Sequence, residues 1–322
     1  MQKSNIKHIL SISQFSKQQV LQYIERASQI KQNGITNTSF PNKTLLTMFY
    51  EPSTRTLCSF QAAAQKLNLK IISMTDKYSS SQKGESLEDT IKTLNYYADA
   101  IVLRHPEKGA AKKAAQVSNI PIINAGDGNG EHPTQALLDI MTIYTELKTR
   151  NIDITSTARD TITITFVGDL KNSRTIHSLI HILALFPKIQ FIYISPPTLE
   201  MPEEIIAQLN SQENLVQQTT NITLKNAIPM TDVLYMTRIQ RERFPTERDY
   251  YSITLNHNYK NYCINKAAIQ PAKPTAIIMH PLPRSTEIDP DVDDDPRAMY
   301  MTQVENGLYM RMAILETIFS SL

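Results

Sequence analysis

The sequence predicts an α/β protein of two doubly wound parallel-sheet domains, with the active site in the cleft between them. Three observations support this fold class. Short apolar runs alternate with amphipathic helical stretches, the 322 residues exceed what one core usually holds, and polar motifs follow the apolar runs. Alternating strands and helices form parallel sheets covered on both faces, and ligands gather at the carboxyl ends of such strands.

The expected elements fall into two groups. In the first half, strands fit Thr44–Tyr50, Leu69–Met74, Ala100–Leu103 and Pro121–Asn124, and helical patterns fit Thr54–Leu67, Ser86–Tyr97, Gly109–Ser118 and Pro133–Leu147. In the second half, strands fit Thr161–Val167, Gln190–Ser195, Val233–Met236 and Ala276–Met279, and a last helix fits Thr302–Ser320. We therefore expect one domain over residues 1–147, a second over 148–300, and a C-terminal helix over 301–322 that packs back towards the first.

Composition excludes several classes of protein. The chain has 33 basic and 31 acidic residues, so its net charge of +2 gives no overall attraction to nucleic acid or membrane. Two distant cysteines, Cys58 and Cys263, are no disulfide framework. No stretch approaches the roughly 18 apolar residues of a membrane helix, and the N-terminus lacks a signal-peptide pattern. We expect a soluble cytoplasmic protein.

Glycine is scarce and placed in motifs. The chain has 8 glycines, whereas average usage would give roughly 22. All except Gly34, which is placed like a helix end, lie in or beside polar, motif-like stretches. Such a chain should keep glycine where no other residue fits the backbone.

The first motif is Ser53-Thr54-Arg55-Thr56, between an expected strand and an expected helix. Hydroxyls and backbone N–H groups at a helix N-terminus bind phosphate, and Arg55 adds a charged fork that matches phosphate oxygens. The alternative is a capped helix with a surface arginine. No Gly-Lys-Ser/Thr loop occurs, so a nucleoside triphosphate is not indicated.

The second cluster joins Arg104-His105-Pro106 to His132-Pro133-Thr134-Gln135, which follows a glycine-rich run at 126–130. Arg104 and His132 can both donate to one carbonyl oxygen as it gains negative charge. The glycine spacing does not fit a dinucleotide fingerprint. Alternatively, His132 is a helix-start histidine bonded to backbone, and His105 is expected to be structural.

Two further motifs follow strands of the second half. They are Gly168-Asp169-Leu170-Lys171 with Arg174, and Thr237-Arg238-Ile239-Gln240. Two arginines from one domain suit a substrate with two carboxylates. Each arginine alone is more often a surface charge, but their shared place at strand ends favours a site.

The last motif is His280-Pro281-Leu282-Pro283-Arg284. Two prolines in four residues force a rigid turn in which one peptide bond before proline can be cis. Such a turn can aim a backbone carbonyl at a substrate amine; the alternative is a plain structural turn.

Asp289, Asp291 and Asp293 open like a calcium loop. The sixth position is Asp294 instead of glycine and the twelfth is Tyr300 instead of glutamate, so a solvated acidic turn is expected. The cysteines and histidines show no metal spacing, and no metal is expected.

Together these motifs resemble the aspartate/ornithine carbamoyltransferase family. The matching blocks run in family order from Phe49 to Leu315: FYEPSTRT, LRHPEKGA, NAGDGNGEHPTQALLD, VGDLKNSRTIHSL, LYMTRIQRERF and IMHPLPR. The resemblance implies carbamoyl transfer from carbamoyl phosphate to an amino acid, without metal or organic cofactor. It makes the first domain the carbamoyl-phosphate-binding domain and the second the acceptor-binding domain.

The second domain resembles the aspartate branch of that family. Ornithine enzymes usually carry cysteine after the last histidine and a Ser-Met-Gly segment, whereas this chain has Pro281 and Thr-Arg-Ile-Gln. An arginine suits a β-carboxylate and repels a cationic ornithine side chain. L-Aspartate is therefore the expected acceptor, which makes residues 148–300 the aspartate-binding domain and gives N-carbamoyl-L-aspartate for pyrimidine biosynthesis.

The resemblance also implies the role of each site residue. Ser53, Thr54, Arg55 and Thr56 would bind the phosphate; Thr56, Arg104 and His132 the carbonyl oxygen; Gln135 and the Leu282 carbonyl the amino group; and Lys83, Arg174, Arg238, Gln240 and Leu282 aspartate. In the family a loop from the neighbouring subunit completes each site, and its residues map to Ser79 and Lys83 in SSSQKGES. The implied assembly is a homotrimer with shared active sites.

Direct attack of the aspartate amine on the carbamoyl carbon is the implied mechanism, through a tetrahedral oxyanion from which phosphate leaves. Orientation and oxyanion donors would supply the catalysis, so Arg55, Thr56, Lys83, Arg104 and His132 are the expected catalytic residues. The alternatives are a carbamoyltransferase for another acceptor, or an inactive homologue that serves as a binding subunit. Regulatory chains and other pathway enzymes stay open as partners.

Overall fold

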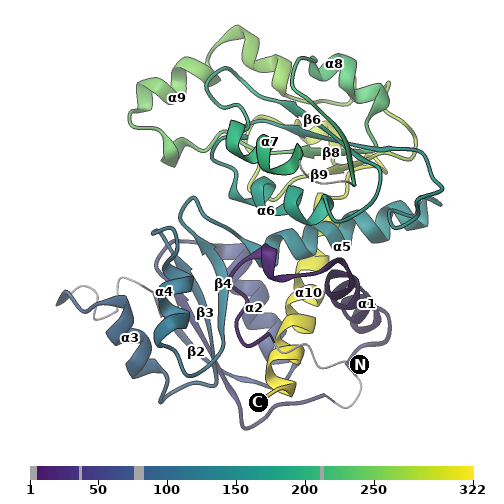
Figure 1. Ribbon diagram of the computed structural model, residues 1–322. Coiled ribbons are helices and arrows are strands. Elements are labelled where there is room, and N and C mark those ends of the chain that lie inside the picture. The colour runs from purple at the N-terminus through teal and green to yellow at the C-terminus, as the bar shows by residue number, and fades with distance from the viewer. Residues whose placement is uncertain (1–5, 36–37, 76–82, 211–213) are drawn as a thin grey trace. The chain divides into compact units, whose positions relative to one another are not determined.

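The computed structural model describes residues 6–35, 38–75, 83–210 and 214–322. The chain forms two compact units: unit 1 comprises Met1–Leu138 and Val304–Leu322, and unit 2 comprises Asp139–Gln303 (Figure 1). The division falls inside helices α5 (Pro133–Thr149) and α10 (Tyr300–Ser320). The sequence placed it at 147 and 300, near the ends of these helices. Because both helices are continuous, their opposite ends contribute to different units.

Unit 1 contains a four-stranded parallel sheet in the order β2-β1-β3-β4. The strands are β1 (Thr44–Phe49), β2 (Lys70–Thr75), β3 (Ala100–His105) and β4 (Ile122–Asp127). The helices are α1 (Lys17–Asn33), α2 (Thr54–Lys66), α3 (Leu87–Leu94) and α4 (Ala110–Val117), with a 3-10 helix at Ile12–Gln14. All four expected strands and the helices between them are present, and Gly34 ends α1 as expected.

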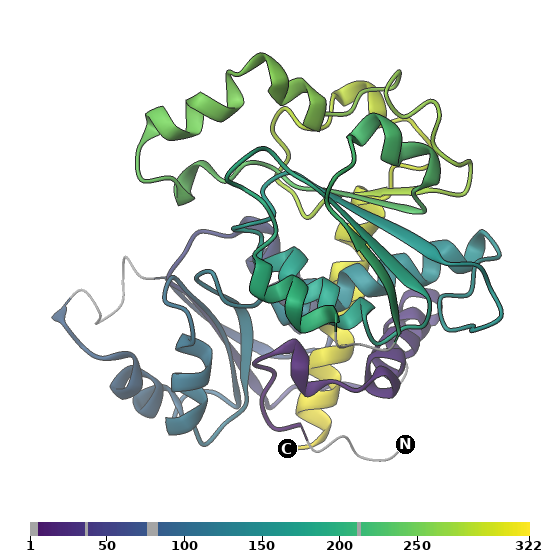
Figure 2. The ribbon, with the colours of Figure 1, turned by 45° about the horizontal axis from the view of Figure 1, so that its top comes forward.

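Helices cover both faces of this sheet (Figures 1 and 2). On one face Ile91 and Leu94 of α3 and Ala114 of α4 pack against Leu46 and Leu103 of the sheet. On the other, α2 contacts β1 and β2, and α10 lies beside it (Figure 1). The strands are therefore apolar on both sides, as a parallel sheet requires.

Unit 2 contains a five-stranded parallel sheet in the order β7-β6-β5-β8-β9. The strands are β5 (Ile162–Val167), β6 (Ile189–Ile194), β7 (Leu215–Thr219), β8 (Val233–Met236) and β9 (Ile277–Met279). The helices are α6 (Arg174–Leu183), α7 (Glu203–Asn210), α8 (Leu224–Ala227) and α9 (Glu247–Thr254). Short 3-10 helices are Ile228–Met230, Arg241–Arg243, His257–Tyr262 and Pro290–Val292.

The two faces of the second sheet have different cores. Phe166, Phe191, Tyr193 and Tyr235 form an aromatic layer on one face. Aliphatic side chains of the strands pack with Leu224 and other residues of α8 and the following loops on the opposite face. The doubly wound fold is confirmed in both units. Strand β7 was not expected, because its sequence LVQQT is mostly polar and gives no apolar run.

Parallel pairing places the polar motifs of each unit at one edge of its sheet. In unit 1, Phe49 at the end of β1 lies opposite Arg104, and His105 lies opposite Asp127. In unit 2, Val167 lies opposite Met236. The segments that follow β1, β3 and β4, and those that follow β5, β8 and β9, therefore start at neighbouring points.

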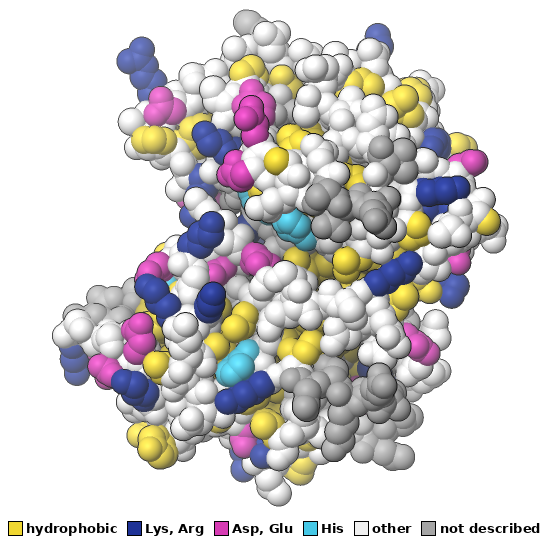
Figure 3. Space-filling view, viewed as in Figure 1, with side chains coloured by type: hydrophobic (Ala, Val, Ile, Leu, Met, Phe, Trp, Pro, Cys, Tyr) yellow, Lys and Arg dark blue, Asp and Glu magenta, His cyan; other side chains and the backbone are white. Residues whose placement is uncertain are grey.

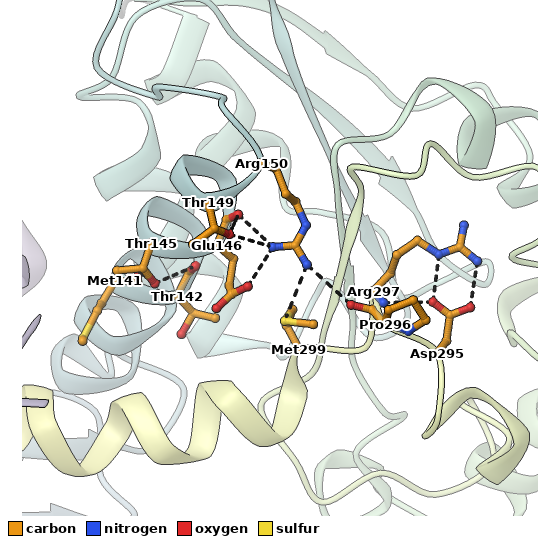
Figure 4. A network of polar contacts seen from close by, with 10 residues as sticks. All are labelled: Met141, Thr142, Thr145, Glu146, Thr149, Arg150, Asp295, Pro296, Arg297 and Met299. Carbon is orange, nitrogen blue, oxygen red and sulfur yellow. Dashed lines mark hydrogen bonds and ion pairs between the residues drawn. The ribbon is translucent and has the colours of Figure 1, made fainter. Parts of the chain in front are cut away.

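A polar network fixes the end of α5 against the segment before α10 (Figure 4). Arg150 donates to the carbonyl and carboxylate oxygens of Glu146 at 2.8 and 2.7 Å, and also to Pro296 O at 3.5 Å. Its Nη2 lies 3.9 Å from the sulfur of Met299. Met299 N in turn donates to Ile278 O of β9 at 2.8 Å. The end of α5, the edge strand β9 and the start of α10 are thus tied together within unit 2.

Charged side chains of both signs are interspersed over the face shown in Figure 3, in keeping with the balanced composition. Among the residues that the structure describes, no helix is long and apolar enough to cross a membrane. Cys58 and Cys263 are both free thiols.

Candidate active site

The Ser53–Thr56 motif forms the N-terminus of α2, directly after β1. Ser53 is the N-cap, its side chain makes no capping hydrogen bond, and its carbonyl accepts from Leu57 N at 3.1 Å. Thr54 and Arg55 are exposed, whereas Thr56 is buried. The first N–H groups of a helix have no partner within the helix, so this turn can hold an anion between backbone donors, hydroxyls and Arg55.

Arg104 lies near the end of β3 with its guanidinium held on two sides. Nη1 donates to Ala125 O at 3.3 Å, and Nη2 lies 3.4 Å from the Glu51 carboxylate. Glu51 was not among the expected site residues. Glu51 follows β1 and lies in the same segment, FYEPSTRT, as Ser53, and this position is the signal that could have identified it.

His132 directly precedes α5, and Gln135 lies in the first turn of that helix. The His132 carbonyl accepts from the backbone N–H groups of Gln135 and Ala136 at 3.0 and 3.1 Å, and the ring of His132 is buried. Both side chains thus lie at the start of the helix that follows β4. Arg104 lies in β3, the neighbour of β4, and the joint action of Arg104 and His132 on one oxygen stays a prediction.

The loop between β4 and α5 is rigidly held. Asp127 accepts from the backbone N–H groups of Gly109 and Glu131, each at 2.8 Å. A Cβ at Gly128, where φ is +49°, would lie 2.4 Å from the Pro106 carbonyl oxygen. Only glycine fits there, because the backbone of the loop that precedes His132 packs directly against the Pro106 carbonyl.

His105 has a structural environment, as expected. Its Nδ1 accepts from Glu107 N at 3.0 Å, and its ring packs edge-on against Tyr50 with centroids 4.7 Å apart. The side chain closes the turn after β3.

Lys83 is exposed and lies between β2 and α3, before the Ser86 cap of α3. The structure brings it into no cluster with the other expected residues of unit 1. Ser79 lies outside the described residues.

The Gly168–Arg174 and Thr237–Gln240 motifs of unit 2 are joined through Asp169. The fully buried Asp169 carboxylate accepts from Asn172 N at 3.0 Å and from Gln240 N at 3.3 Å. Burial raises the pKa of Asp169 above its ordinary value, against the opposing effect of these donors. A Cβ at Gly168 would lie 2.0 Å from Thr237 O, so glycine allows the β5 end to meet the β8 end.

Arg174, Arg238 and Gln240 are all half-buried at this edge. Arg174 is the first residue of α6, and Arg238 follows β8. Arg238 forms a two-bond ion pair with Glu242, one bond being 2.9 Å. Burial lowers the pKa of Arg238 and Glu242 raises it, with a net upward shift. Glu242 was not expected; its spacing of four residues from Arg238 was the available signal.

The His280–Arg284 turn is held by a buried histidine. His280 Nδ1 accepts from Leu282 N at 2.8 Å, and Nε2 lies 2.7 Å from Glu287 Oε1. Burial lowers the pKa of His280, and these partners fit the neutral tautomer with the proton on Nε2. The peptide bond between Leu282 and Pro283 is cis, as expected for one bond of this turn.

The three acidic residues of the calcium-like segment have separate partners. Asp289 caps the 3-10 helix at Pro290–Val292, and Asp291 accepts from Lys266 N at 3.0 Å. Asp293 pairs with Arg284, which lowers its pKa to about 2. Within the described ranges, no group of three or more His, Cys, Asp or Glu side chains is arranged to hold a metal ion.

The expected residues therefore form two clusters, one in each unit. Unit 1 gathers Ser53, Thr54, Arg55, Thr56, Arg104, His132 and Gln135, and unit 2 gathers Arg174, Arg238, Gln240 and Leu282. A separate pocket of about 700 Å³ lies beyond β6 in unit 2 and contains none of them. Cys263 is in its wall, and burial raises the pKa of that thiol to about 11, so the thiol is not an activated nucleophile.

Comparison with known proteins covers both clusters. Residues 7–145 match the carbamoyl-P binding domain, and residues 160–318 the Asp/Orn binding domain, of aspartate/ornithine carbamoyltransferases. The chain therefore belongs to the aspartate/ornithine carbamoyltransferase family.

Among the similar proteins are an aspartate carbamoyltransferase, an aspartate transcarbamoylase and a multifunctional protein. The chain is 43% identical to the aspartate carbamoyltransferase catalytic subunit of Methanocaldococcus jannaschii over 97% of each chain. It is 44% identical to the multifunctional protein pyr1-3 of Dictyostelium discoideum, over 98% of this chain but only 14% of that protein. A Trypanosoma cruzi aspartate transcarbamoylase structure with N-(phosphonacetyl)-L-aspartic acid superimposes with a TM-score of 0.87, at 38% identity over 97% of this chain and 95% of that chain.

Proposed function

We propose that this chain transfers the carbamoyl group of carbamoyl phosphate to the amino group of L-aspartate, giving N-carbamoyl-L-aspartate and phosphate for pyrimidine biosynthesis. The observation that carries the proposal is the identity of 43% to an aspartate carbamoyltransferase catalytic subunit over 97% of each chain, and the two motif clusters of this chain agree with it. The bound phosphonacetyl-aspartate of the Trypanosoma cruzi relative joins a phosphonate to an aspartate, which suits one anion-binding and one acceptor-binding cluster.

Unit 1 would bind carbamoyl phosphate. Its phosphate would lie at the N-terminus of α2, among Ser53, Thr54, Arg55 and Thr56. Thr56, Arg104 and His132 would hold the carbonyl oxygen and stabilise the negative charge that develops on it. The Gln135 side chain and the Leu282 carbonyl would accept from its amino group. None of these steps needs a covalent enzyme intermediate or a metal.

Unit 2 would bind L-aspartate. Arg238 and Arg174 would pair with its two carboxylates, while Gln240 and the Leu282 carbonyl would orient its amine. Neither the neutral side-chain amide of asparagine nor the positive side-chain ammonium of ornithine could form the ion pair with Arg238. The acceptor is thus selected by a charged side chain at the end of β8.

A homotrimer with shared active sites is part of the proposal, on the resemblance of SSSQKGES to the family loop that reaches a neighbouring subunit. Ser79 and Lys83 would then complete the phosphate site of the adjacent chain, and the exposed position of Lys83 agrees with this role. We place the reaction in the cytoplasm, where free thiols such as Cys58 and Cys263 are usual.

The direct test is a colorimetric ureido-product assay with carbamoyl phosphate and, separately, aspartate, asparagine and ornithine. Activity with aspartate alone supports the proposal. Activity with another acceptor would show a related carbamoyltransferase. If no ureido product forms with any acceptor although carbamoyl phosphate binds, the chain is an inactive homologue.

A further inference from the structure

A buried hydrogen-bond cluster lies in unit 2, next to the segments proposed to bind the amino-acid acceptor. It consists of Asp139 of α5, Tyr235 of β8 and Gln303 of α10, and we name it the Asp139 cluster. The Asp139 carboxylate accepts from Tyr235 Oη at 2.7 Å and from Gln303 Nε2 at 2.6 Å. The three side chains are 0–1% exposed. Burial, together with the Asp139 charge, raises the pKa of Tyr235, so its hydroxyl stays a donor.

Each arm of the cluster reaches a different acceptor segment. Tyr235 lies in β8, which leads directly into Thr237 and Arg238, and its hydroxyl also bonds to Thr175, the neighbour of Arg174. Gln303 Oε1 accepts from His280 N at 3.0 Å, at the start of the turn that presents the Leu282 carbonyl. One carboxylate therefore connects α6, β8 and the His280–Arg284 turn through two side chains.

Apolar packing alone would hold these segments less specifically. Aliphatic contacts determine which face of a strand or helix is buried, but they tolerate small sliding movements. Hydrogen bonds to a buried carboxylate fix distances and directions, and a partly satisfied carboxylate in such a site is costly. The ties of Arg150 at the far end of α5 hold the same helix against the segment before α10 (Figure 4). The helix that carries Asp139 is thus also tied, at its C-terminal end, to the segment before α10.

We propose that the Asp139 cluster positions the acceptor-binding groups, by setting Arg174, Arg238 and the Leu282 carbonyl at fixed places relative to one another. The inference rests on the proposed roles of those three groups. Asp139, Tyr235 and Gln303 are positioning residues, since none is assigned a contact with substrate. The cluster determines how well aspartate is bound and oriented for attack, and it leaves the phosphate-binding turn of α2 unaffected.

Tyr235→Phe tests the proposal because it removes one oxygen atom. The matched control is Tyr193→Phe: Tyr193 is in the same sheet, is 3% exposed, and donates to Gln218 at 2.8 Å. Tyr235→Phe should lower kcat/KM for aspartate by roughly 10- to 100-fold, the range for a lost supporting interaction or a small misplacement. Tyr193→Phe should change it less than about twofold. In Tyr235→Phe the KM for carbamoyl phosphate should change less than that for aspartate, because only one of its proposed partners, the Leu282 carbonyl, lies on a segment that the cluster holds.

Gln303→Leu gives a second, independent measurement. It should lower kcat/KM for aspartate in the same way, because it removes the bond to His280 N as well as the bond to Asp139. In the double variant with Tyr235→Phe, the combined loss should be smaller than the product of the single losses, since both act through one carboxylate.

The outcomes separate the two levels of the argument. If Tyr235→Phe and Gln303→Leu behave like Tyr193→Phe while Arg238→Ala still raises the aspartate KM, the positioning role is wrong and the proposed function stands. Equal losses towards carbamoyl phosphate and aspartate would show general destabilisation and would also overturn it. If Arg238→Ala leaves the aspartate KM unchanged, the acceptor assignment fails, and the positioning role fails with it.

Discussion

The strand-end clusters of the two units hold their charged groups in different ways. In unit 1, most of the expected groups lie at the N-terminus of α2 or beside a loop closed by Asp127 and Gly128, and one long side chain, Arg104, lies near the Glu51 carboxylate. In unit 2, the charged groups are the long side chains of Arg174 and Arg238, and Arg238 pairs with Glu242. The segments that carry them are joined by Asp169 and by the Asp139 cluster.

This difference would match the tasks proposed for the two units. A phosphate has the same shape in every substrate, so a cradle of backbone donors serves it without discrimination. An amino-acid acceptor must be distinguished from near relatives, and only directed side chains can read its charge. Substitutions in unit 1 should therefore reduce turnover, and substitutions in unit 2 should alter the choice and affinity of the acceptor.

The largest expected effect concerns the phosphate site and tests whether it is shared. Arg55→Ala and Lys83→Ala chains should each lose roughly 1,000-fold in activity. Each variant lacks a positively charged side chain that would otherwise stabilise the phosphate and the group in transfer. When the two inactive chains are mixed and reassembled, part of the activity should return. In a mixed trimer some interfaces unite an intact Arg55 with an intact Lys83 of another chain. Ureido-product formation by the reassembled trimer is the measurement.

Lys92→Ala is the matched control, since Lys92 is also an exposed lysine of this region and pairs with Asp89 on α3. It should keep near-normal activity alone. A verified mixed trimer without recovered activity, or a fully active monomer, would refute the shared site and leave the reaction assignment standing.

The next effect separates turnover from acceptor binding in unit 1. Arg104→Ala and His132→Ala should each lower kcat by about 100- to 1,000-fold, the usual loss for one oxyanion donor. The aspartate KM should change little, because neither residue is among the groups proposed to bind aspartate, most of which lie in unit 2. Steady-state kinetics with both substrates varied would check this. His105→Gln, which changes a structural neighbour of Arg104, is the control and should stay within about tenfold of normal turnover. Near-normal kcat in either alanine variant would remove that residue from the oxyanion site.

In unit 2 the corresponding substitution should affect the acceptor instead. Arg238→Ala should raise the aspartate KM by roughly 100-fold, since it leaves a substrate carboxylate unpaired. It should also reduce the preference for aspartate over asparagine, while carbamoyl phosphate binding stays within about twofold. Competition assays with both acceptors would measure the preference. A loss of carbamoyl phosphate affinity would place Arg238 on the other substrate.

The fold could be predicted from the sequence, because apolar runs are local features. The motifs after these runs also nominated Arg104 and Arg238 as site residues, and those assignments stay predictions. The groups proposed to support the acceptor motifs were not foreseen. Asp139 lies in the apolar helical pattern LLDIMTIY, and Tyr235 looks like an ordinary strand residue. Their roles depend on which segments meet in space, and one sequence does not contain that pairing.

Substitution of Glu242, the ion-pair partner of Arg238, should raise the aspartate KM less than substitution of Arg238 itself. The Glu242 side chain is 54% exposed, and exposed ion pairs contribute about 0–1 kcal/mol. Glu242→Gln should therefore raise the aspartate KM less than about fivefold. Asp169→Asn, which alters a fully buried acceptor of Gln240 N, should raise it more. The reverse order in measured KM values would mean that the ion pair, and not the buried carboxylate, orders the acceptor segments.

The smallest effect is on stability in acid, and it concerns the buried pair that holds the last turn of unit 2. Burial lowers the pKa of His280 below its ordinary value of 6.5. As the pH falls below 6.5, the unfolded chain binds a proton that folded His280 does not, so the free energy of unfolding decreases, by at most about 1.4 kcal/mol per pH unit. Burial raises the pKa of Glu287, but the bond from His280 outweighs it, and the net downward shift adds a loss of the same sign below pH 4.5. Denaturant titrations from pH 7.5 to 4, at fixed protein concentration, would measure both. Glu287→Gln should reduce the pH dependence of the free energy of unfolding only below pH 4.5.

Burial also lowers the pKa of His8, so the contribution of His280 is measured in the variant His8→Gln. If the free energy of unfolding of that variant were constant between pH 6.5 and 5.5, His280 would take up its proton as readily in the folded chain as in the unfolded one. The prediction for His280 would then be wrong.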